Sequence, residues 1–302
     1  MTITRKDIAN AYDKIAPHLR TTPVVEYDGV TFKLEFLQHT GSFKARGALA
    51  NVFLRDVPKA GVAAASGGNH GIAVAFAAQK SGIPASIFVP KDAPAAKKAR
   101  IREYGAKLND RWTHYDDAYK ACDKFIADSG AMGIHAYDQR ETMMGAGTLG
   151  LELSRQAKDI DTIIVSVGGG GLAAGIAAWY GGKIKVIGVE PRLAPTLNAA
   201  LKAGVPVEVN PRSIANDSLG ASWVGDEPFP VAKKYVESVL VNDSDIRNAQ
   251  RELWKRYRIA AEAGGATAYA ALLSQRYVPS KGERVAVLVC GANTDAVAFP
   301  RK

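Results

Sequence analysis

The sequence predicts an α/β fold with mostly parallel strands, and two observations predict it. Short runs of β-branched and apolar residues alternate with longer stretches of helical periodicity along almost the whole chain of 302 residues. Glycine-rich or polar turns follow three of those runs, at the positions where a parallel sheet binds its ligands. No repeat or low-complexity linker divides the chain. We therefore expect two lobes joined by chain crossovers rather than tethered domains.

The expected elements follow in order along the chain. The N-terminal segment MTITRKDIANAYDKI is typical of an amphipathic helix, with Thr4 and Asp7 at the spacing of a capping box. Strands are expected at residues 31–34, 61–65, 85–89, 161–167, 183–189, 239–241 and 284–289. Helices are expected at residues 69–80, 94–104, 115–128, 141–156, 172–179 and 243–258. This order of strand and helix favours parallel pairing.

Composition and charge exclude several classes of protein. Hydrophobic residues make up 47% and charged residues 23%, as in ordinary globular proteins. The net charge is +9, but the densest basic stretch, residues 97–102, has no interleaved aromatic side chains. A solvated helix face is expected there rather than a nucleic-acid site. No apolar run is long enough for a membrane span or a signal core. Cys122 and Cys290 have no disulfide or metal-ligand spacing, which favours a cytoplasmic setting.

Glycine is the unusual residue type, with 29 residues in the chain, or ~10% against a usual ~7%. Clustered glycine indicates backbone that approaches a ligand closely. Three turns that are rich in glycine or in polar residues follow predicted strands. They are Ser66-Gly67-Gly68-Asn69-His70-Gly71, Gly168-Gly169-Gly170-Gly171, and Cys290-Gly291-Ala292-Asn293-Thr294.

The run of four glycines, Gly168 to Gly171, predicts a phosphate site. Between a strand and a helix, such a run brings backbone N–H groups and the positive end of the helix dipole toward an anion. The sequence around this run also matches loosely the fingerprint of a site for a nicotinamide dinucleotide. Gly168, Gly170 and Ala173 match a dinucleotide fingerprint, and Glu190 follows Gly168 by 22 residues, where an acidic residue would hold a ribose. A nicotinamide dehydrogenase therefore stays open as an alternative.

A reactive lysine is predicted in the segment Gly41-Ser42-Phe43-Lys44-Ala45-Arg46-Gly47. A polar turn precedes Lys44, Phe43 offers an aromatic face to a planar ring, and a helix begins near the lysine. The positive potential at a helix N-terminus lowers the pKa of an amine, and the uncharged amine is the nucleophilic form.

Five motifs occur in this order along the chain: KLEFLQHTGSFKARGA, ASGGNHGIA, SVGGGGLAAGI, GVEP and LVCGANTD. Together they resemble the fold-type II pyridoxal-phosphate enzymes, specifically the serine/threonine dehydratase (threonine ammonia-lyase) group. The resemblance runs from Thr21 to Asn293 and implies pyridoxal 5'-phosphate as the cofactor. It also implies the two-lobed fold of the tryptophan synthase β-subunit, with a small mobile lobe at residues 61–138 and a large cofactor-binding lobe at residues 1–60 and 139–302.

The resemblance implies a role for each site residue. Lys44 would form a Schiff base with the cofactor aldehyde and act as the catalytic base. Cofactor contacts are implied for Phe43, for Asn69 at the 3-hydroxyl oxygen, for Gly168, Gly169, Gly170, Gly171 and Leu172 at the phosphate, and for Cys290 at the pyridine nitrogen. Contacts to the substrate carboxylate are implied for Ser66, Gly67, Gly68, Asn69 and His70.

The implied reaction is the dehydration and deamination of L-threonine or L-serine to a 2-oxo acid and ammonia. A neutral thiol at the pyridine nitrogen makes a weaker electron sink than an aspartate and disfavours transamination. Gly67 stands where serine racemases of the family have a second serine, so elimination is favoured over racemisation. Thr196 stands where the racemase branch has an acidic residue near its cation, so no metal is expected. A dehydratase for hydroxyaspartate or phenylserine, or a serine racemase, stays open.

The expected partners are few. The resemblance implies a homodimer that acts on a small amino acid, and neither nucleic acid nor a membrane is expected as a partner. Nine residues follow Asn293, so the C-terminal regulatory region of biosynthetic threonine dehydratases is not expected.

Overall fold

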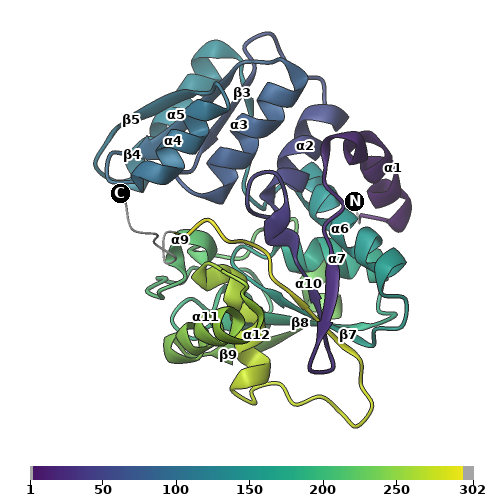
Figure 1. Ribbon diagram of the computed structural model, residues 1–302. Coiled ribbons are helices and arrows are strands. Elements are labelled where there is room, and N and C mark those ends of the chain that lie inside the picture. The colour runs from purple at the N-terminus through teal and green to yellow at the C-terminus, as the bar shows by residue number, and fades with distance from the viewer. Residues whose placement is uncertain (1–2, 295–302) are drawn as a thin grey trace, which may run out of the picture.

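The computed structural model describes residues 3–294, which form two sheets flanked by helices (Figure 1). Within these residues the larger sheet has six strands: β1 (Val24–Tyr27), β2 (Val30–Lys33), β7 (Thr162–Ser166), β8 (Lys185–Pro191), β9 (Val236–Val241) and β10 (Val285–Leu288). The smaller sheet, over the same part of the chain, has four: β3 (Val62–Ala65), β4 (Ala85–Pro90), β5 (Lys107–Trp112) and β6 (Met132–Gly133). The predicted α/β class is confirmed.

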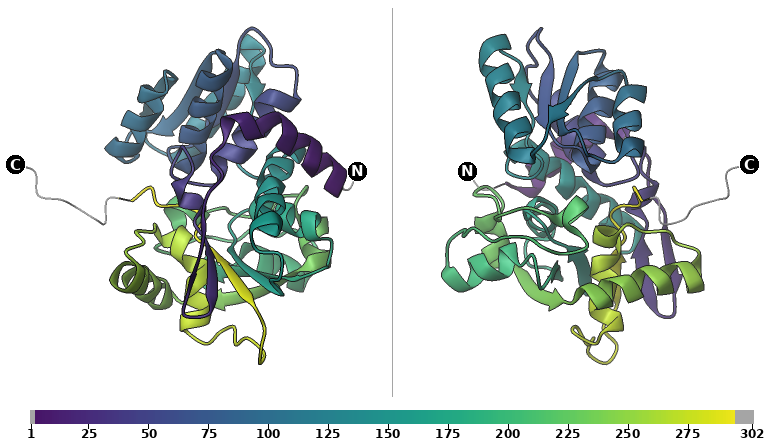
Figure 2. Two further views of the ribbon diagram at one scale, coloured as in Figure 1. Left: turned by 45° about the vertical axis from the view of Figure 1, so that its right-hand side comes forward. Right: turned by 90° about the vertical axis from the view of Figure 1, so that its left-hand side faces the viewer.

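Helices surround both sheets (Figure 2). They are α1 (Arg5–Ile15), α2 (Lys44–Leu54), α3 (Asn69–Ser81), α4 (Ala95–Glu103), α5 (Tyr115–Ser129), α6 (Arg140–Gln156), α7 (Gly171–Tyr180), α8 (Thr196–Ala203), α9 (Asn216–Leu219), α10 (Phe229–Tyr235), α11 (Asp243–Tyr257) and α12 (Ala263–Leu273). No helix in this described part of the chain is long and apolar enough to cross a membrane.

The larger sheet has the strand order β1-β2-β10-β7-β8-β9, and its neighbours are parallel except for the antiparallel β1–β2 hairpin. Strands β7 and β10 are buried throughout, because helices cover both faces of a parallel sheet and such strands become continuous apolar runs. The carboxyl ends of β7 and β10 lie at the same edge. This arrangement brings the four-glycine turn and Cys290 close to each other.

The smaller sheet has the order β5-β4-β3-β6 and is parallel throughout. All four of its strands fall within residues 61–138. Helix α2 packs against α3 beside this sheet and against α6, and α6 packs in turn against α7 of the larger sheet. The chain thus crosses between the sheets through α2 and α6. The mobility of residues 61–138 stays a prediction.

A cluster of four charged side chains lies buried where α2, α6 and β2 meet. Arg46 of α2 donates to Glu35 (Nε to Oε1, 2.6 Å) and to Glu152 (Nη2 to Oε2, 2.8 Å), and Lys33 Nζ lies 2.5 Å from Glu152 Oε1. Lys33, Glu35 and Arg46 are completely buried. Because two positive charges meet two negative ones, this buried ion cluster ties α2 to the strand and helix on either side.

Every strand and helix expected from the sequence is present, with ends shifted by a few residues. The N-terminal helix begins as predicted, since Thr4 and Asp7 form a reciprocal capping box. The sequence did not predict β1, β5, β6, α8, α9, α10 or α12. Strand β5, with the polar sequence KLNDRW, lies at a sheet edge, where burial imposes little apolar pattern.

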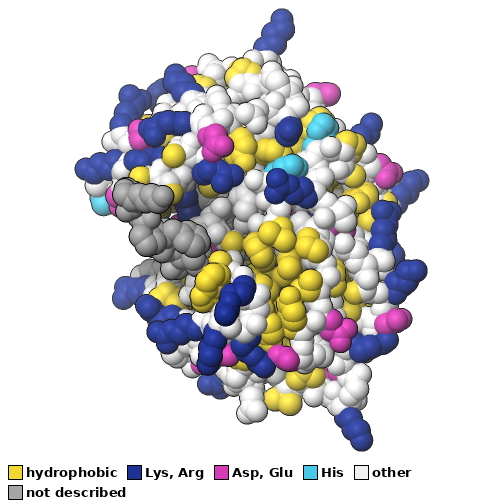
Figure 3. All heavy atoms as spheres, viewed as in Figure 1, with side chains coloured by type: hydrophobic (Ala, Val, Ile, Leu, Met, Phe, Trp, Pro, Cys, Tyr) yellow, Lys and Arg dark blue, Asp and Glu magenta, His cyan; other side chains and the backbone are white. Residues whose placement is uncertain are grey.

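The expectation of a solvated face for residues 97–102 is wrong for Lys97. This side chain is 6% exposed, and its ammonium pairs with Asp217 of α9. Helix α4 belongs to the part of the chain that forms the smaller sheet, so the ion pair joins this part to the larger sheet. On the face seen in Figure 3, Lys and Arg side chains are spread around the outline, with hydrophobic side chains gathered between them.

Candidate active site

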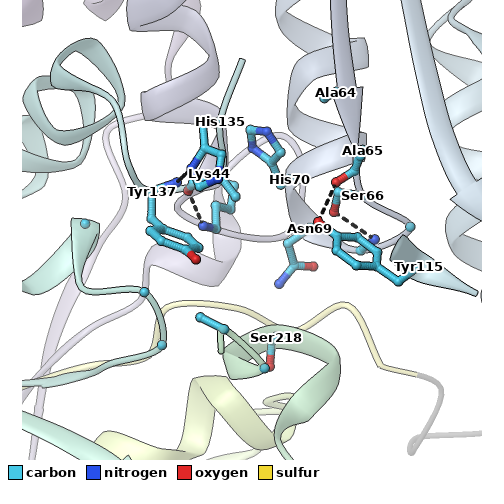
Figure 4. Close-up of a pocket in the computed structure, with 18 of the residues that line it drawn as sticks. Lys44, Ala64, Ala65, Ser66, Asn69, His70, Tyr115, His135, Tyr137 and Ser218 are labelled. Atoms are coloured by element: carbon cyan, nitrogen blue, oxygen red, sulfur yellow. Dashed lines mark hydrogen bonds between the residues drawn. The ribbon is translucent and has the colours of Figure 1, made fainter. Parts of the chain in front are cut away.

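One cavity brings together all the residues that the sequence predicted for the site. Its volume of about 690 Å³ is typical of small-molecule sites, and Figure 4 shows side chains from several segments converging on it. The predicted residues that line it are Phe43, Lys44, Ser66, Gly67, Gly68, Asn69, His70, Gly168, Gly169, Gly170, Gly171, Leu172 and Cys290. Segments far apart in the sequence therefore meet at one place, while the individual roles of these residues stay predictions.

Lys44 is the first residue of α2, as the sequence predicted for the reactive lysine. The turn before it is fastened to the end of β10. Ser42 forms an isolated β-bridge with Gly291, and the Phe43 amide donates to the Cys290 carbonyl at 3.0 Å. The start of the lysine helix and the third turn are thus held together by backbone pairing.

The Lys44 amine is buried away from solvent. Its Nζ donates to the Ala136 carbonyl at 2.6 Å, and Figure 4 shows the side chain beside His70, His135 and Tyr137. Burial lowers the pKa of Lys44 to about 8, against a smaller opposing effect of Cys290 and Glu262, because the charged form is poorly solvated. Near neutral pH a useful fraction of this amine is therefore uncharged and nucleophilic.

The four-glycine turn joins β7 to α7, and three of its glycines are required by their surroundings. Gly170 has φ +89°, a left-handed conformation. A Cβ on Gly169 would lie 2.3 Å from the ring of Tyr137, and one on Gly171 would lie 2.9 Å from the Tyr137 carbonyl oxygen. The first N–H groups of a helix have no partner within it. The turn lines the cavity, and unpaired N–H groups at a helix N-terminus are able to bind an anion.

Asn69 is held by a residue that the sequence did not predict, Glu262. Asn69 Nδ2 donates to Glu262 Oε1 at 2.6 Å, and Asn293 Nδ2 donates to Asn69 Oδ1 at 2.7 Å. An amide nitrogen carries two hydrogens, so the second N–H of Asn69 is available to a ligand oxygen. Burial raises the pKa of Glu262 to about 7. Its Oε2 is buried and has no partner among the described residues.

The loop before α3 also lines the cavity. The Gly68 amide donates to Ser66 Oγ at 3.3 Å, and a Cβ on Gly71 would lie 2.1 Å from the Ser66 carbonyl oxygen, so the loop wraps closely around the start of α3. His70 Nε2 donates to the Ile134 carbonyl at 2.8 Å, and burial lowers the pKa of His70 to about 3. The ring is neutral and engaged, so the contact that His70 offers an anion is its backbone amide.

Cys290 lies at the end of β10 with its thiol buried. Sγ lies 3.7 Å from the Gly264 carbonyl oxygen, to which it donates. Burial raises the pKa of Cys290 to about 12, so the thiol is neutral at physiological pH. The single S–H hydrogen can turn from the Gly264 carbonyl to a ring nitrogen, because a neutral thiol can donate without transferring its proton.

Glu190, the acidic residue of the dinucleotide alternative, is not available to a ribose. Its carboxylate is completely buried and accepts hydrogen bonds from the Thr196 hydroxyl, from the Leu197 and Asn198 amides at the start of α8, and from the Ser238 hydroxyl. These bonds occupy the lone pairs of both oxygens. Glu190 is therefore a structural residue.

Pyridoxal phosphate fits the groups that line this cavity. A desolvated amine with a lowered pKa can react with an aldehyde, and a glycine turn at a helix N-terminus can hold a phosphate. Asn69 has a spare N–H for a phenolic oxygen, and Cys290 offers a neutral thiol to a pyridine nitrogen. The donors present on Lys44, the turn, Asn69 and Cys290 thus match the functional groups of the cofactor.

Known proteins that are similar to this chain in sequence and fold have several functions. A phenylserine dehydratase from Ralstonia pickettii is 36% identical over 311 residues, covering 97% of this chain and 94% of that protein. An L-threonine ammonia-lyase from Thermotoga maritima is 37% identical, covering 90% of this chain and 69% of that protein. The solved structure of maize serine racemase matches with a TM-score of 0.92 at 32% identity, covering 98% of this chain and 95% of that one.

The family itself follows from the whole length of the match. The sequence model of the family described as "Pyridoxal-phosphate dependent enzyme" matches residues 15–291. The resemblance seen in the five sequence motifs is thereby confirmed, and with it the cofactor and the fold type. This chain belongs to the pyridoxal-phosphate dependent enzyme family.

Proposed function

We propose that this enzyme eliminates water from a small β-hydroxy amino acid, L-threonine or L-serine, and releases a 2-oxo acid and ammonia. The observation that carries the proposal is the buried Lys44 amine, in one cavity with two glycine-rich turns that each precede a helix. A substrate for such a site needs a carboxylate, and the cofactor needs a phosphate. The L-threonine ammonia-lyase relative supports the same reaction class.

Each glycine-rich turn binds one of these groups. The turn of Gly168 to Gly171, with the Leu172 amide, binds the cofactor phosphate. The loop from Ser66 to His70 binds the substrate carboxylate through its amides and the Ser66 hydroxyl. The positive ends of α7 and α3 add to both sites. Two helix N-termini thus orient the two ligands relative to Lys44.

Lys44 moves the proton that starts the elimination. When bound, pyridoxal phosphate stabilises the negative charge left at Cα after its proton departs. Lys44 Nζ, as the uncharged amine, accepts that proton. The Ala136 carbonyl, 2.6 Å from Nζ, orients the amine and accepts a hydrogen bond from it in both protonation states. The pKa of about 8 lets this group act as a base near neutral pH.

The neutral thiol of Cys290 favours elimination over transamination. Its pKa of about 12 leaves the proton on sulfur, so the pyridine nitrogen is not held as a cation. A bound cofactor with an uncharged pyridine nitrogen would leave more negative charge at Cα, which would favour loss of the β-hydroxyl as water. Glu262 and Asn293 hold the Asn69 amide in place for the ring oxygen.

Racemisation is disfavoured because the opposite side of the site lacks a proton donor at position 67. A Cβ on Gly67 would lie 2.9 Å from Ala93 Cβ, so even a small side chain needs a shift of the backbone. We expect the enzyme to convert L-serine to pyruvate at least about 10²-fold faster than it converts L-serine to D-serine, since a positioned acid or base contributes that much to a rate. Chiral chromatography of the reaction mixture measures both products. Comparable rates for the two would contradict this expectation.

The lowered pKa of Lys44 predicts how cofactor attachment depends on pH. Mixing apoprotein with pyridoxal phosphate should give a visible absorption band whose rate of appearance rises with pH and levels off above about 8, because only the uncharged amine attacks. Between pH 6 and 7 the rise should be about tenfold, from the titration of a single group. Stopped-flow absorbance measures the rate. A rate that still rises from pH 9 to 10 would mean that the amine is not desolvated.

The function is tested by assaying a panel of β-hydroxy amino acids for 2-oxo acid and ammonia. The proposal expects equal amounts of both products from L-threonine or L-serine. The absence of product from the whole panel, with cofactor bound, would overturn it.

A homodimer and a cytoplasmic setting are part of this proposal. Cys122 and Cys290 are both free and buried, as is common where thiols stay reduced. The hydrophobic side chains gathered on the face in Figure 3 offer a surface that a second copy could cover. Sedimentation velocity of the holoenzyme tests the subunit number.

A further inference from the structure

One helix face forms a wall of the cavity that the mechanism above does not use. Tyr115, Asp116, Tyr119, Cys122 and Asp123 all line the cavity. They lie at the spacing of a single face of α5, at positions i, i+1, i+4, i+7 and i+8. Nothing in the cofactor assignment accounts for this wall, so it is free to contact the rest of the substrate.

Aromatic side chains on this wall and elsewhere in the cavity lining are unusually exposed for their size. Tyr115 is 50% exposed and Tyr119 is 40% exposed, and Trp223, which also lines the cavity, is 42% exposed. The rings of Tyr115 and Tyr119 form a tilted pair with centroids 6.3 Å apart. Aromatic surface gathered in a pocket is typical of a site that buries an apolar or aromatic ligand group.

Tyr115 stands next to the loop assigned to the substrate carboxylate. Its hydroxyl donates to the Ala65 carbonyl at 3.2 Å, which fixes the ring, and Figure 4 shows that ring beside Ser66 and Asn69. A substrate whose carboxylate is bound by this loop therefore has an aromatic surface within its reach.

The charges of the lining exclude one kind of side chain. Among the described residues that line the cavity, Lys44 is the only lysine or arginine, whereas Asp116, Asp123 and Asp217 contribute carboxylates. A second carboxylate on the substrate would find no arginine or lysine partner in this lining and would be repelled by Asp116 and Asp123, whereas Asp217 is already paired with Lys97. An acidic β-substituent, as in hydroxyaspartate, is therefore disfavoured.

From the exposed aromatic wall and the absence of a second cation, we infer that the preferred substrates are β-hydroxy amino acids with an aromatic, uncharged β-substituent, such as phenylserine. Tyr115 and Tyr119 are the residues that determine this specificity, by packing against the substituent. The inference rests on the proposed β-elimination and names its substrate class. It keeps the β-elimination proposed above and places aromatic β-hydroxy amino acids ahead of L-threonine and L-serine as substrates.

The test compares kcat/KM of the holoenzyme for phenylserine, threonine and hydroxyaspartate, followed as 2-oxo acid formation. We expect phenylserine to exceed threonine by at least about tenfold, since burial of a ring is worth that much, and hydroxyaspartate to be the poorest. Tyr119→Ala should lower kcat/KM for phenylserine about tenfold and change that for threonine less than about twofold. Tyr115→Phe, which keeps the ring, should retain the preference.

The matched control is Trp254→Ala. This side chain is an aromatic residue of α11, 44% exposed, that does not line the cavity, so its removal should leave all three values unchanged. If the enzyme turns over threonine and its kcat/KM for phenylserine is equal or lower, the inferred specificity would be overturned, whereas the proposed β-elimination would stand. Preference for hydroxyaspartate would also overturn it. No turnover of these three or of L-serine, with cofactor bound, would overturn the proposed function itself.

Discussion

Replacing Lys44 by alanine is expected to lower kcat for β-elimination at least about 10³-fold, because the variant loses both the nucleophile for the cofactor and the base for the Cα proton. The visible absorption of lysine-bound cofactor should disappear in the same variant. Purified protein, incubated with pyridoxal phosphate and desalted, is assayed for both properties. We expect an intact fold, since the interactions of the Lys44 amine with described residues are one hydrogen bond to the Ala136 carbonyl and a contact with the Phe43 ring.

The control for this experiment is Lys6→Ala, a substitution at an exposed lysine on α1 far from the cavity. It should keep both the absorption band and full turnover. A Lys44→Ala protein that keeps wild-type turnover would show that another group abstracts the proton, and the assignment of the base would be wrong.

Replacing Arg46 by methionine is expected to lower the free energy of unfolding by about 3–5 kcal/mol, the usual cost of breaking a buried ion pair from one side. After the substitution, the buried ion cluster keeps the two carboxylates of Glu35 and Glu152 but has a single positive charge, that of Lys33. Urea unfolding followed by circular dichroism measures the change.

The position of Arg46 also links this stability to the site, since it lies two residues after Lys44 on α2. Arg46→Lys should recover part of the loss, because an ammonium retains the charge but not the planar guanidinium that binds two carboxylates at once. Lys124→Ala, which removes an exposed i,i+4 pair with Asp128, should change stability by less than about 0.5 kcal/mol. A loss below about 1 kcal/mol for Arg46→Met would show that the buried ion cluster contributes little.

Most of the fold could be predicted because its central strands are short apolar runs followed by turns of glycine and polar residues. Strands β7 and β10 show this pattern clearly, and the turns after them carry residues that line the cavity. Strand β5 was not predicted because a strand at the edge of a sheet needs no apolar face, and its sequence therefore lacks the apolar pattern of a strand. Helix α12 escaped because Gly264 and Gly265 suggest a turn, whereas they allow a helix to pack closely: a Cβ on Gly265 would lie 2.1 Å from the Gly291 carbonyl oxygen.

The site was predictable where a motif carries the chemistry, and not where only the fold brings residues together. Lys44 and the four-glycine turn could be found from their neighbours in the sequence. Glu262 could not, because its hydrogen bond to Asn69 joins residues 193 positions apart. Tyr119 could not either, since an isolated tyrosine on a polar helix gives no sign that it faces a cavity. Lys97 likewise looked like a surface lysine until its pairing with Asp217 was seen.

The central claim is that Lys44 is the residue that carries the cofactor, and it has a direct test. The holoenzyme is reduced with borohydride, digested, and each lysine-containing peptide is analysed by mass spectrometry for attached pyridoxyl phosphate. We expect the label on Lys44 alone, at about one per chain, because among the described lysines it alone lines the cavity. Label on another lysine, or an unlabelled Lys44 in active protein, would contradict the claim.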